Sequence, residues 1–270
     1  MSYKVFATIA FTFAFTGVAS GKTIGELTAS GSAEDQGRAV IEELGRRNAG
    51  YKDFIGEVEM DLEDATGGKA HRGFSVKILE RQAGGSDGDR SLIVFSSPAD
   101  IKGTSVLSHT HTSAEDEQWL FLPASRRTKR VSSSNRSGAF VGSEFTFEDL
   151  TASDPRKFAW AVRGKESCGA AQCVTLEAVP KDPSSAYSKR VLHVDGDLRV
   201  QSVDFFDKKG SKLKTLAYGD YQQLEGGFWR AKSWTMKNTQ SGKGTTLRFT
   251  TMKLKSSLST SDFLPEKLGS

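Results

Sequence analysis

Alternating apolar and polar residues begin at Phe54 and recur along most of the chain. In Phe54–Leu62, the residues Val58, Met60 and Leu62 fall on one face, because successive side chains of an extended strand point to opposite sides. Residues rich in glycine, aspartate and proline separate the segments with this pattern. The pattern predicts a long antiparallel meander, with further strands at residues 74–79, 91–95, 118–122, 158–162, 173–179, 190–194, 200–206, 213–218, 229–235 and 245–254.

One amphipathic helix is predicted in front of these strands, over Ala33–Arg47. Ser32 precedes it and is a favoured N-cap residue. Ala39, Val40 and Leu44 form an apolar face at helical spacing. We therefore expect a helix that packs on a sheet, with one further helical turn near the C-terminus.

The organisation indicates a single domain over residues 22–270, since no linker and no repeat of fixed period interrupts the strands. Residues 124–154 lack alternation and are expected to be rich in loops. The bulky apolar side chains are more than one small helix can cover. A strongly curved sheet either packs such side chains together or leaves a cavity on its concave face.

The first residues read as a cleavable secretory signal, residues 1–21. Lys4 supplies a positive charge, an apolar run extends from Val5 to Val18, and small residues follow. The apolar run is shorter than the roughly 20 residues that a membrane-spanning helix needs. We therefore expect an exported protein, located in the periplasm, whose mature chain has no transmembrane segment.

Export changes how the cysteines and the charge are interpreted. Cys168 and Cys173 are the only two cysteines, and such a close pair in an exported chain predicts a disulfide that closes a hairpin. The formal net charge of +4 is small for 270 residues and gives no indication of nucleic-acid binding.

Three stretches together resemble a known family. They are Ser97–Thr104 (SPADIKGT), Trp119–Ala124 (WLFLPA) with the basic residues that follow, and Phe140–Leu150 (FVGSEFTFEDL). Their order is similar to that of the periplasmic outer-membrane lipoprotein-sorting proteins of the LolA-like group, often found beside RND-type exporters. With the flanking strands, the resemblance covers roughly residues 50–255.

The resemblance implies a mainly β fold: one curved antiparallel sheet, an open half-barrel of the LolA/LolB type, with helices on its concave side. It also implies a hydrophobic cavity for lipid or the acyl chains of a lipoprotein, and it leaves the cargo open. No cofactor, no bound metal and no catalytic residue is expected for such a carrier. Candidates for the cavity lining are Phe74, Val76, Ile78, Ile93, Phe95, Trp119, Phe121, Phe145, Phe147 and Trp160.

Two polar clusters suggest other chemistry. His109 and His111 are spaced to share one side of a strand and could bind zinc with the acids that follow, although a polar loop between strands is the favoured interpretation. No Gly-x-Ser-x-Gly nucleophile turn or glycine-rich phosphate loop accompanies them. The basic run Arg126, Arg127, Lys129 and Arg130 could contact phospholipid headgroups or an acidic partner, or could form a solvated face.

These observations leave three hypotheses. The first is a periplasmic carrier that moves lipid or lipoprotein acyl chains toward the outer membrane. The second is a non-enzymatic accessory or sensor module that partners a membrane exporter, for example an RND-type transporter. The third, the least favoured, is a metal-dependent enzyme that uses His109 and His111.

Overall fold

The computed structural model describes residues 14–15, 21–81, 87–112, 114–132, 135–151, 154–169 and 171–269. Apart from Ala14, Phe15 and Gly21, the predicted signal lies outside these residues, so its cleavage stays a prediction. In the described part of the chain, no helix is long and apolar enough to cross a membrane.

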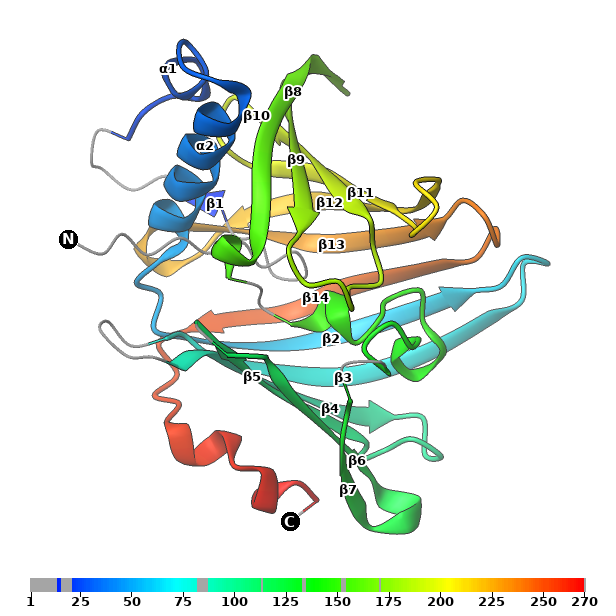
Figure 1. The fold of residues 1–270 in the computed structure, drawn as a ribbon. Coiled ribbons are helices and arrows are strands. Elements are labelled where there is room, and N and C mark those ends of the chain that lie inside the picture. Colours follow the sequence, from blue (N-terminus) through cyan, green and yellow to red (C-terminus); the bar gives the residue numbers. More distant parts are fainter. Residues whose placement is uncertain are drawn as a thin grey trace.

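Fourteen strands form one sheet in which every pairing is antiparallel (Figure 1). Their order is β7-β6-β5-β4-β3-β2-β14-β13-β12-β11-β10-β9-β8, and β1 pairs with β13 off this path. The strands are β1 (Ala14–Phe15), β2 (Asp53–Glu63), β3 (Lys69–Leu79), β4 (Asp87–Ser97), β5 (Ser105–His111), β6 (Glu117–Leu122), β7 (Arg127–Arg130), β8 (Phe158–Cys168), β9 (Ala171–Pro180), β10 (Lys189–Asp195), β11 (Val200–Phe206), β12 (Lys212–Gln223), β13 (Phe228–Asn238) and β14 (Gly244–Leu254).

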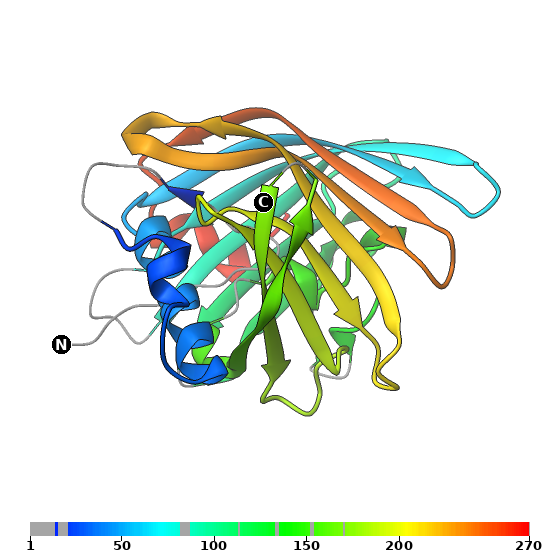
Figure 2. The ribbon, with the colours of Figure 1, turned by 90° about the horizontal axis from the view of Figure 1, so that it is seen from above.

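The sheet is strongly curved and open, and its two ends do not pair with each other (Figure 2). This is the antiparallel meander that the alternation predicted, in the mainly β, half-barrel architecture that the resemblance implied. The meander is continuous except at one point: β2 pairs with β14, so the first and last long strands lie together in the middle of the sheet. The segment between β7 and β8 therefore connects the two free ends, and it passes over the concave side.

Two α-helices precede the long strands, α1 (Ile24–Leu27) and α2 (Ala33–Asn48). Ser32 caps α2 as predicted, since its side chain accepts a hydrogen bond from the backbone N–H of Asp35. Helix α2 packs against β8, and an ideal Cβ at Gly37 would lie 2.7 Å from the backbone nitrogen of Ala161. Only glycine permits this close approach of helix and strand.

Short 3₁₀ turns complete the fold. They are η1 (Pro123–Ser125), η3 (Phe140–Gly142), η4 (Glu148–Leu150), η5 (Pro155–Lys157), η6 (Glu225–Gly227), η7 (Thr260–Phe263) and η8 (Pro265–Lys267). The turn expected near the C-terminus is η8, which follows η7 along the outside of the β4 and β5 region (Figure 1).

Strand β5 was not predicted, because the interior face of Ser105–His111 carries polar side chains. Ser108 and Thr110 are both buried, at 2% and 6% exposure. The favoured interpretation of His109 and His111 as loop residues was therefore wrong: both lie in a strand. Cys168 and Cys173 form the predicted disulfide across the β8–β9 hairpin, with a Cα–Cα distance of 5.8 Å.

Candidate functional site

The concave face of β3 and β4 carries five of the predicted lining residues. Phe74 pairs in register with Phe95, and Val76 pairs with Ile93, so their side chains share one face of the sheet. These four residues and Ile78 are buried in the main apolar cluster. Their burial on one face agrees with the alternation in the sequence, and their role as the lining of a cavity stays a prediction.

A segment with neither α-helix nor β-strand, which contains only the 3₁₀ turns η3 and η4, covers this face, and we call residues 138–150 the plug. Phe140 donates its backbone N–H to Phe145 O at 2.7 Å, and Phe147 donates to Gly138 O at 3.2 Å, so the plug closes on itself as a small hairpin. Phe140 and Phe145 are each 1% exposed. The ring of Phe140 lies 5.5 Å from that of Phe95 and 6.0 Å from that of Phe147, measured between centroids. The plug thus fills the concave side opposite β3 and β4.

Trp160, on β8, also joins the main cluster, beside α2 rather than beside the plug. Its indole Nε1 donates to Pro155 O at 2.7 Å, and its ring lies 5.6 Å from that of Phe158. Eight of the ten predicted lining residues therefore share the interior cluster: Phe74, Val76, Ile78, Ile93, Phe95, Phe145, Phe147 and Trp160.

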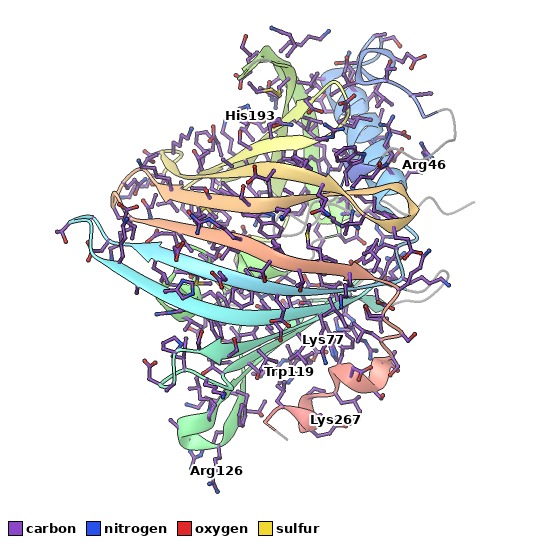
Figure 3. All side chains as sticks on the ribbon, turned by 180° about the vertical axis from the view of Figure 1, so that it is seen from behind. Arg46, Lys77, Trp119, Arg126, His193 and Lys267 are labelled. Atoms are coloured by element: carbon purple, nitrogen blue, oxygen red, sulfur yellow. A yellow bond between two sulfur atoms is a disulfide. The ribbon has the colours of Figure 1, made fainter. Side chains whose placement is uncertain are left out.

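The other two, Trp119 and Phe121, lie on the opposite face, and the expectation that they face the interior is wrong. Trp119 packs with Leu107 and Phe263 in a separate small cluster under the C-terminal segment (Figure 3). An ideal Cβ on Gly269 would fall within the ring of Phe121, which places that ring against the same segment. Their neighbour Leu120 faces inward instead.

The two histidines of β5 make structural contacts. His109 Nε2 lies 2.7 Å from Phe263 O, which ties β5 to the C-terminal segment, and burial lowers the pKa of His109. His111 lies 3.2 Å from the carboxylate of Glu117. Among the residues that the structure describes, no group of three or more His, Cys, Asp or Glu side chains could hold a metal ion.

The basic run extends from the β6–β7 turn along the edge strand β7. All four residues of β7 are exposed, and Arg126 lies at the tip of the hairpin in Figure 3. Arg130 pairs with Glu117 at 2.8 Å. Leu122, next to the turn, is 36% exposed. A basic edge with one apolar side chain beside it is thus presented to solvent.

Buried charges inside the sheet were not predicted. Lys214 on β12 is 2% exposed, and its Nζ lies 2.7 Å from Oδ2 of Asp149, a plug residue that is 1% exposed. Burial alone would raise the pKa of Asp149, but the charges of Lys214 and Arg190 and the Lys214 hydrogen bond outweigh it and lower this pKa. Tyr187 donates its hydroxyl proton to the same carboxylate at 2.9 Å.

A second buried cation lies beside the first. Arg190 on β10 is 1% exposed and donates from Nη2 to Oε1 of Glu148 at 2.6 Å. Its guanidinium also lies over the rings of Phe158, Tyr187 and Phe205, at 5.2, 4.9 and 5.6 Å. Arg190 and Lys214 occupy strand positions in phase with buried apolar residues, and that mismatch is the signal in the sequence that could have identified them.

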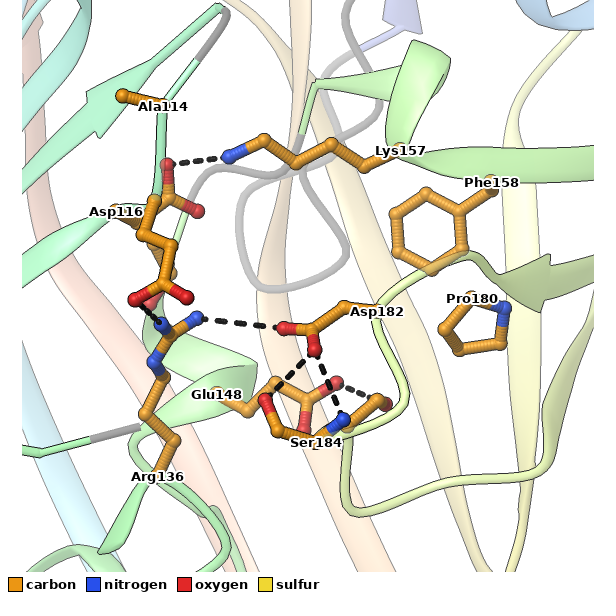
Figure 4. Close-up of a pocket in the computed structure, with 12 residues that line it drawn as sticks. Ala114, Asp116, Arg136, Glu148, Lys157, Phe158, Pro180, Asp182 and Ser184 are labelled. Carbon is orange, nitrogen blue, oxygen red and sulfur yellow. Dashed lines mark hydrogen bonds and ion pairs between the residues drawn. The ribbon is translucent and has the colours of Figure 1, made fainter. Parts of the chain in front are cut away.

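A pocket of about 470 Å³ opens next to these charges. Its walls include Glu148, Phe158 and Ser185, which border the Arg190 site (Figure 4). At its rim Arg136 lies 3.9 Å from Asp182, and Lys157 pairs with Asp116 at 2.6 Å. Arg136 also lies 3.7 Å from Glu115, so the rim carries two cations and three carboxylates, and Glu148 lies between the pocket and Arg190.

Known proteins resemble this chain in both sequence and fold. A family model described as uncharacterized protein matches residues 87–270. A solved domain from Vibrio parahaemolyticus, assigned as an outer membrane lipoprotein-sorting protein, is 37% identical with a TM-score of 0.83, over 87% of this chain and 99% of that one. A DUF1329 family protein from Desulfovibrio piger is 25% identical with a TM-score of 0.82, over 88% of this chain and 100% of that one.

A third structure, a LolA superfamily protein from Nitrosomonas europaea, is 19% identical with a TM-score of 0.67 and is similar in fold. It aligns over 87% of this chain and 98% of its own length. No curated protein sequence matches the chain.

Proposed function

This chain belongs to the LolA-like family of outer membrane lipoprotein-sorting proteins, and from that premise we propose that it is a periplasmic carrier for lipid or lipoprotein acyl chains. The observation that carries the proposal is that the plug covers the concave face of the sheet. The aromatic and aliphatic side chains of β3 and β4 lie under an irregular plug, and the plug forms no ladder with the sheet.

The contacts of the plug suit a segment that detaches from the sheet and packs on it again. Its backbone–backbone hydrogen bonds stay within residues 135–151 and none goes to the sheet. Its hydrogen bonds with the sheet use side chains: Thr245 accepts from the Glu144 N–H, and Gln118 donates to Phe147 O. Its departure would therefore break no strand pairing. The uncovered face would hold an acyl chain, whose apolar surface costs about 25 cal/mol per Å² when it is exposed to water.

Fluorescent fatty acid binding to the purified protein, together with native mass spectrometry of protein from its own periplasm, tests the proposal. We expect co-purifying lipid and saturable binding. Phe140→Ala should strengthen binding, because it removes a side chain that competes for the same face. Phe263→Ala is the matched control, since it deletes an equally buried phenylalanine from the outer cluster and should leave affinity unchanged. Absence of binding by both the wild type and Phe140→Ala would overturn the carrier function.

A second candidate function is an accessory or sensor module for a membrane exporter. The filled interior and the exposed basic edge strand β7 favour it, because such a module needs a docking surface and no cavity. Crosslinking in cells followed by purification would separate the two functions. A stable transporter partner without bound lipid supports the module, and lipid without a partner supports the carrier.

A further inference from the structure

The plug resembles an anionic lipid in having a negatively charged end and an apolar body. Its carboxylates, Glu148 and Asp149, lie at one end over β10 and β12, where they meet Arg190 and Lys214. Its apolar body, Phe147 and Phe140, extends from there to Phe95 on β4. A charged end and an apolar body thus occupy the interior side by side.

We propose that Arg190 and Lys214 form the head-group site for an anionic amphiphile, a carboxylate or phosphate ester on an acyl chain, and that Glu148 and Asp149 occupy this site in the closed state. The inference rests on the carrier function proposed above. It adds the chemical class of the ligand and the two residues that select it.

The two cations are built into the sheet, whereas both carboxylates come from the plug. Arg190 lies on β10 and Lys214 on β12, and in the described part of the chain their salt-bridge partners are Glu148 and Asp149 alone. Departure of the plug would leave two buried positive charges uncompensated, which is costly. A ligand that replaces the plug must therefore bring negative charge to the same place.

The site has unused capacity for an anion. Arg190 Nε is buried and has no hydrogen-bond partner among the described residues. A phosphate or carboxylate could accept from Nε and Nη2 together in the bidentate geometry that guanidinium favours, whereas Glu148 accepts from Nη2 alone. The rings of Tyr187 and Phe205 lie beneath both cations and would border the first carbons of the chain.

The pocket of about 470 Å³ supplies an approach to this site. Glu148 forms part of its wall (Figure 4). Its carboxylate is held by Arg190, by the Ser185 hydroxyl at 2.6 Å and by the Ala186 N–H at 2.7 Å. An anion that enters the pocket would displace Glu148 first. Ser185 and the Ala186 N–H are further donors that the incoming anion could use.

Calorimetric titration below the critical micelle concentration tests the proposal, with dodecyl phosphate, dodecanol and inorganic phosphate as probes. We expect dodecyl phosphate to bind the wild type at least tenfold more tightly than dodecanol. In the neutral double variant Lys214→Met/Asp149→Asn this preference should fall below threefold while dodecanol still binds, because the variant removes one charge from the sheet and one from the plug. The exposed pair Lys255→Met/Glu225→Gln is the matched control and should keep the full preference.

A second variant keeps the cations and removes the competing carboxylates, Glu148→Gln/Asp149→Asn. Dodecyl phosphate should raise its melting temperature more than that of the wild type, because the ligand restores the missing negative charge. This readout is available even if the free variant is unstable.

The outcomes separate the two proposals. Equal binding of dodecyl phosphate and dodecanol by the wild type overturns the head-group site and leaves the carrier standing. Inorganic phosphate that binds as tightly as dodecyl phosphate also overturns it, in favour of a site for a small free anion. Absence of binding by either amphiphile overturns the carrier function, and the head-group site with it.

Discussion

Replacement of Asp149 by asparagine isolates the buried ion pair between the plug and the sheet. Asparagine keeps the shape of the side chain and can still accept from Tyr187, but it leaves the charge of Lys214 without its carboxylate. At 2.7 Å and an effective dielectric constant of about 20, the attraction lost is about 6 kcal/mol. A hydrogen bond from Lys214 to the neutral amide offsets about 1.5–3 kcal/mol of this lost attraction. We therefore expect a loss of about 3–4.5 kcal/mol, within the range usual for breaking a buried pair.

Urea unfolding followed by tryptophan fluorescence at pH 7 measures this loss directly. Lys214→Met/Asp149→Asn should return to within about 1 kcal/mol of the wild type, because no uncompensated charge is then buried. The control is Glu225→Gln, which breaks the exposed pair with Lys255 and should cost less than about 1 kcal/mol.

The pH dependence supplies an independent check. The pKa of Asp149 is lowered in the folded protein, so its contribution is present above the unfolded pKa of about 3.9 and is lost as the pH falls through the folded value. Asp149→Asn should lack that acid-dependent loss. A destabilisation below about 1 kcal/mol, or a double variant as unstable as the single one, would refute the assignment of a strong buried pair.

Three further variants test other parts of the structure. Gly37→Ala should cost about 1–3 kcal/mol in urea unfolding although alanine favours helices, because the new Cβ would lie 2.7 Å from the Ala161 nitrogen; a stabilised variant would contradict the close packing of α2 on β8. Burial raises the pKa of Asp89 to about 7, so only the folded state keeps this proton from about pH 3.9 to 7, and wild-type stability should fall with rising pH across that window. Asp89→Asn should lose this slope when the free energy of unfolding is measured at pH 5 and pH 8, and an unchanged slope would contradict the raised pKa. Replacing Cys168 and Cys173 by serine should lower the free energy of unfolding by no more than about 2 kcal/mol, since the bridge spans a sequence separation of 5. A variant that is globally unfolded at 25 °C would contradict this prediction.

Local patterns in the sequence were sufficient for most of the long strands, for α2 and for the disulfide. Period-two alternation located β2 and β3 because each has one buried and one solvated face. Ser32 and the first turn after it located the start of α2. The pairing of β2 with β14 joins segments far apart in the sequence, and no local pattern specifies it.

The face of β6 was predicted wrongly because both of its sides are covered. Trp119-Leu120-Phe121-Leu122 contains no polar residue, so alternation cannot distinguish inward from outward positions. The choice is made by the C-terminal segment, which places Phe263 against the Trp119 side. Such a contact between distant segments has no signal within the strand.

The buried cations escaped prediction for a related reason. Arg190 and Lys214 lie in phase with apolar neighbours, where a charged residue usually ends an apolar face. Their burial is possible only because the plug brings carboxylates to them, and residues 124–154 showed no periodicity from which to place the plug. The site exists only where the plug and the two strands meet.

The balance between plug and ligand follows from the two kinds of contact that the plug makes. Phe140 and Phe145 are fully buried, and exposing such side chains costs about 1.5–3 kcal/mol each, so opening without a ligand is uphill. Under the proposed carrier function, an acyl chain would offset this cost by covering the same face. It offsets nothing at Arg190 and Lys214, where loss of the plug carboxylates costs several kcal/mol unless another anion arrives. Under the proposed head-group site, exchange would therefore be nearly balanced for an anionic amphiphile and strongly uphill for a neutral one. The buried pairs would then act mainly to select the ligand and contribute little to net stability.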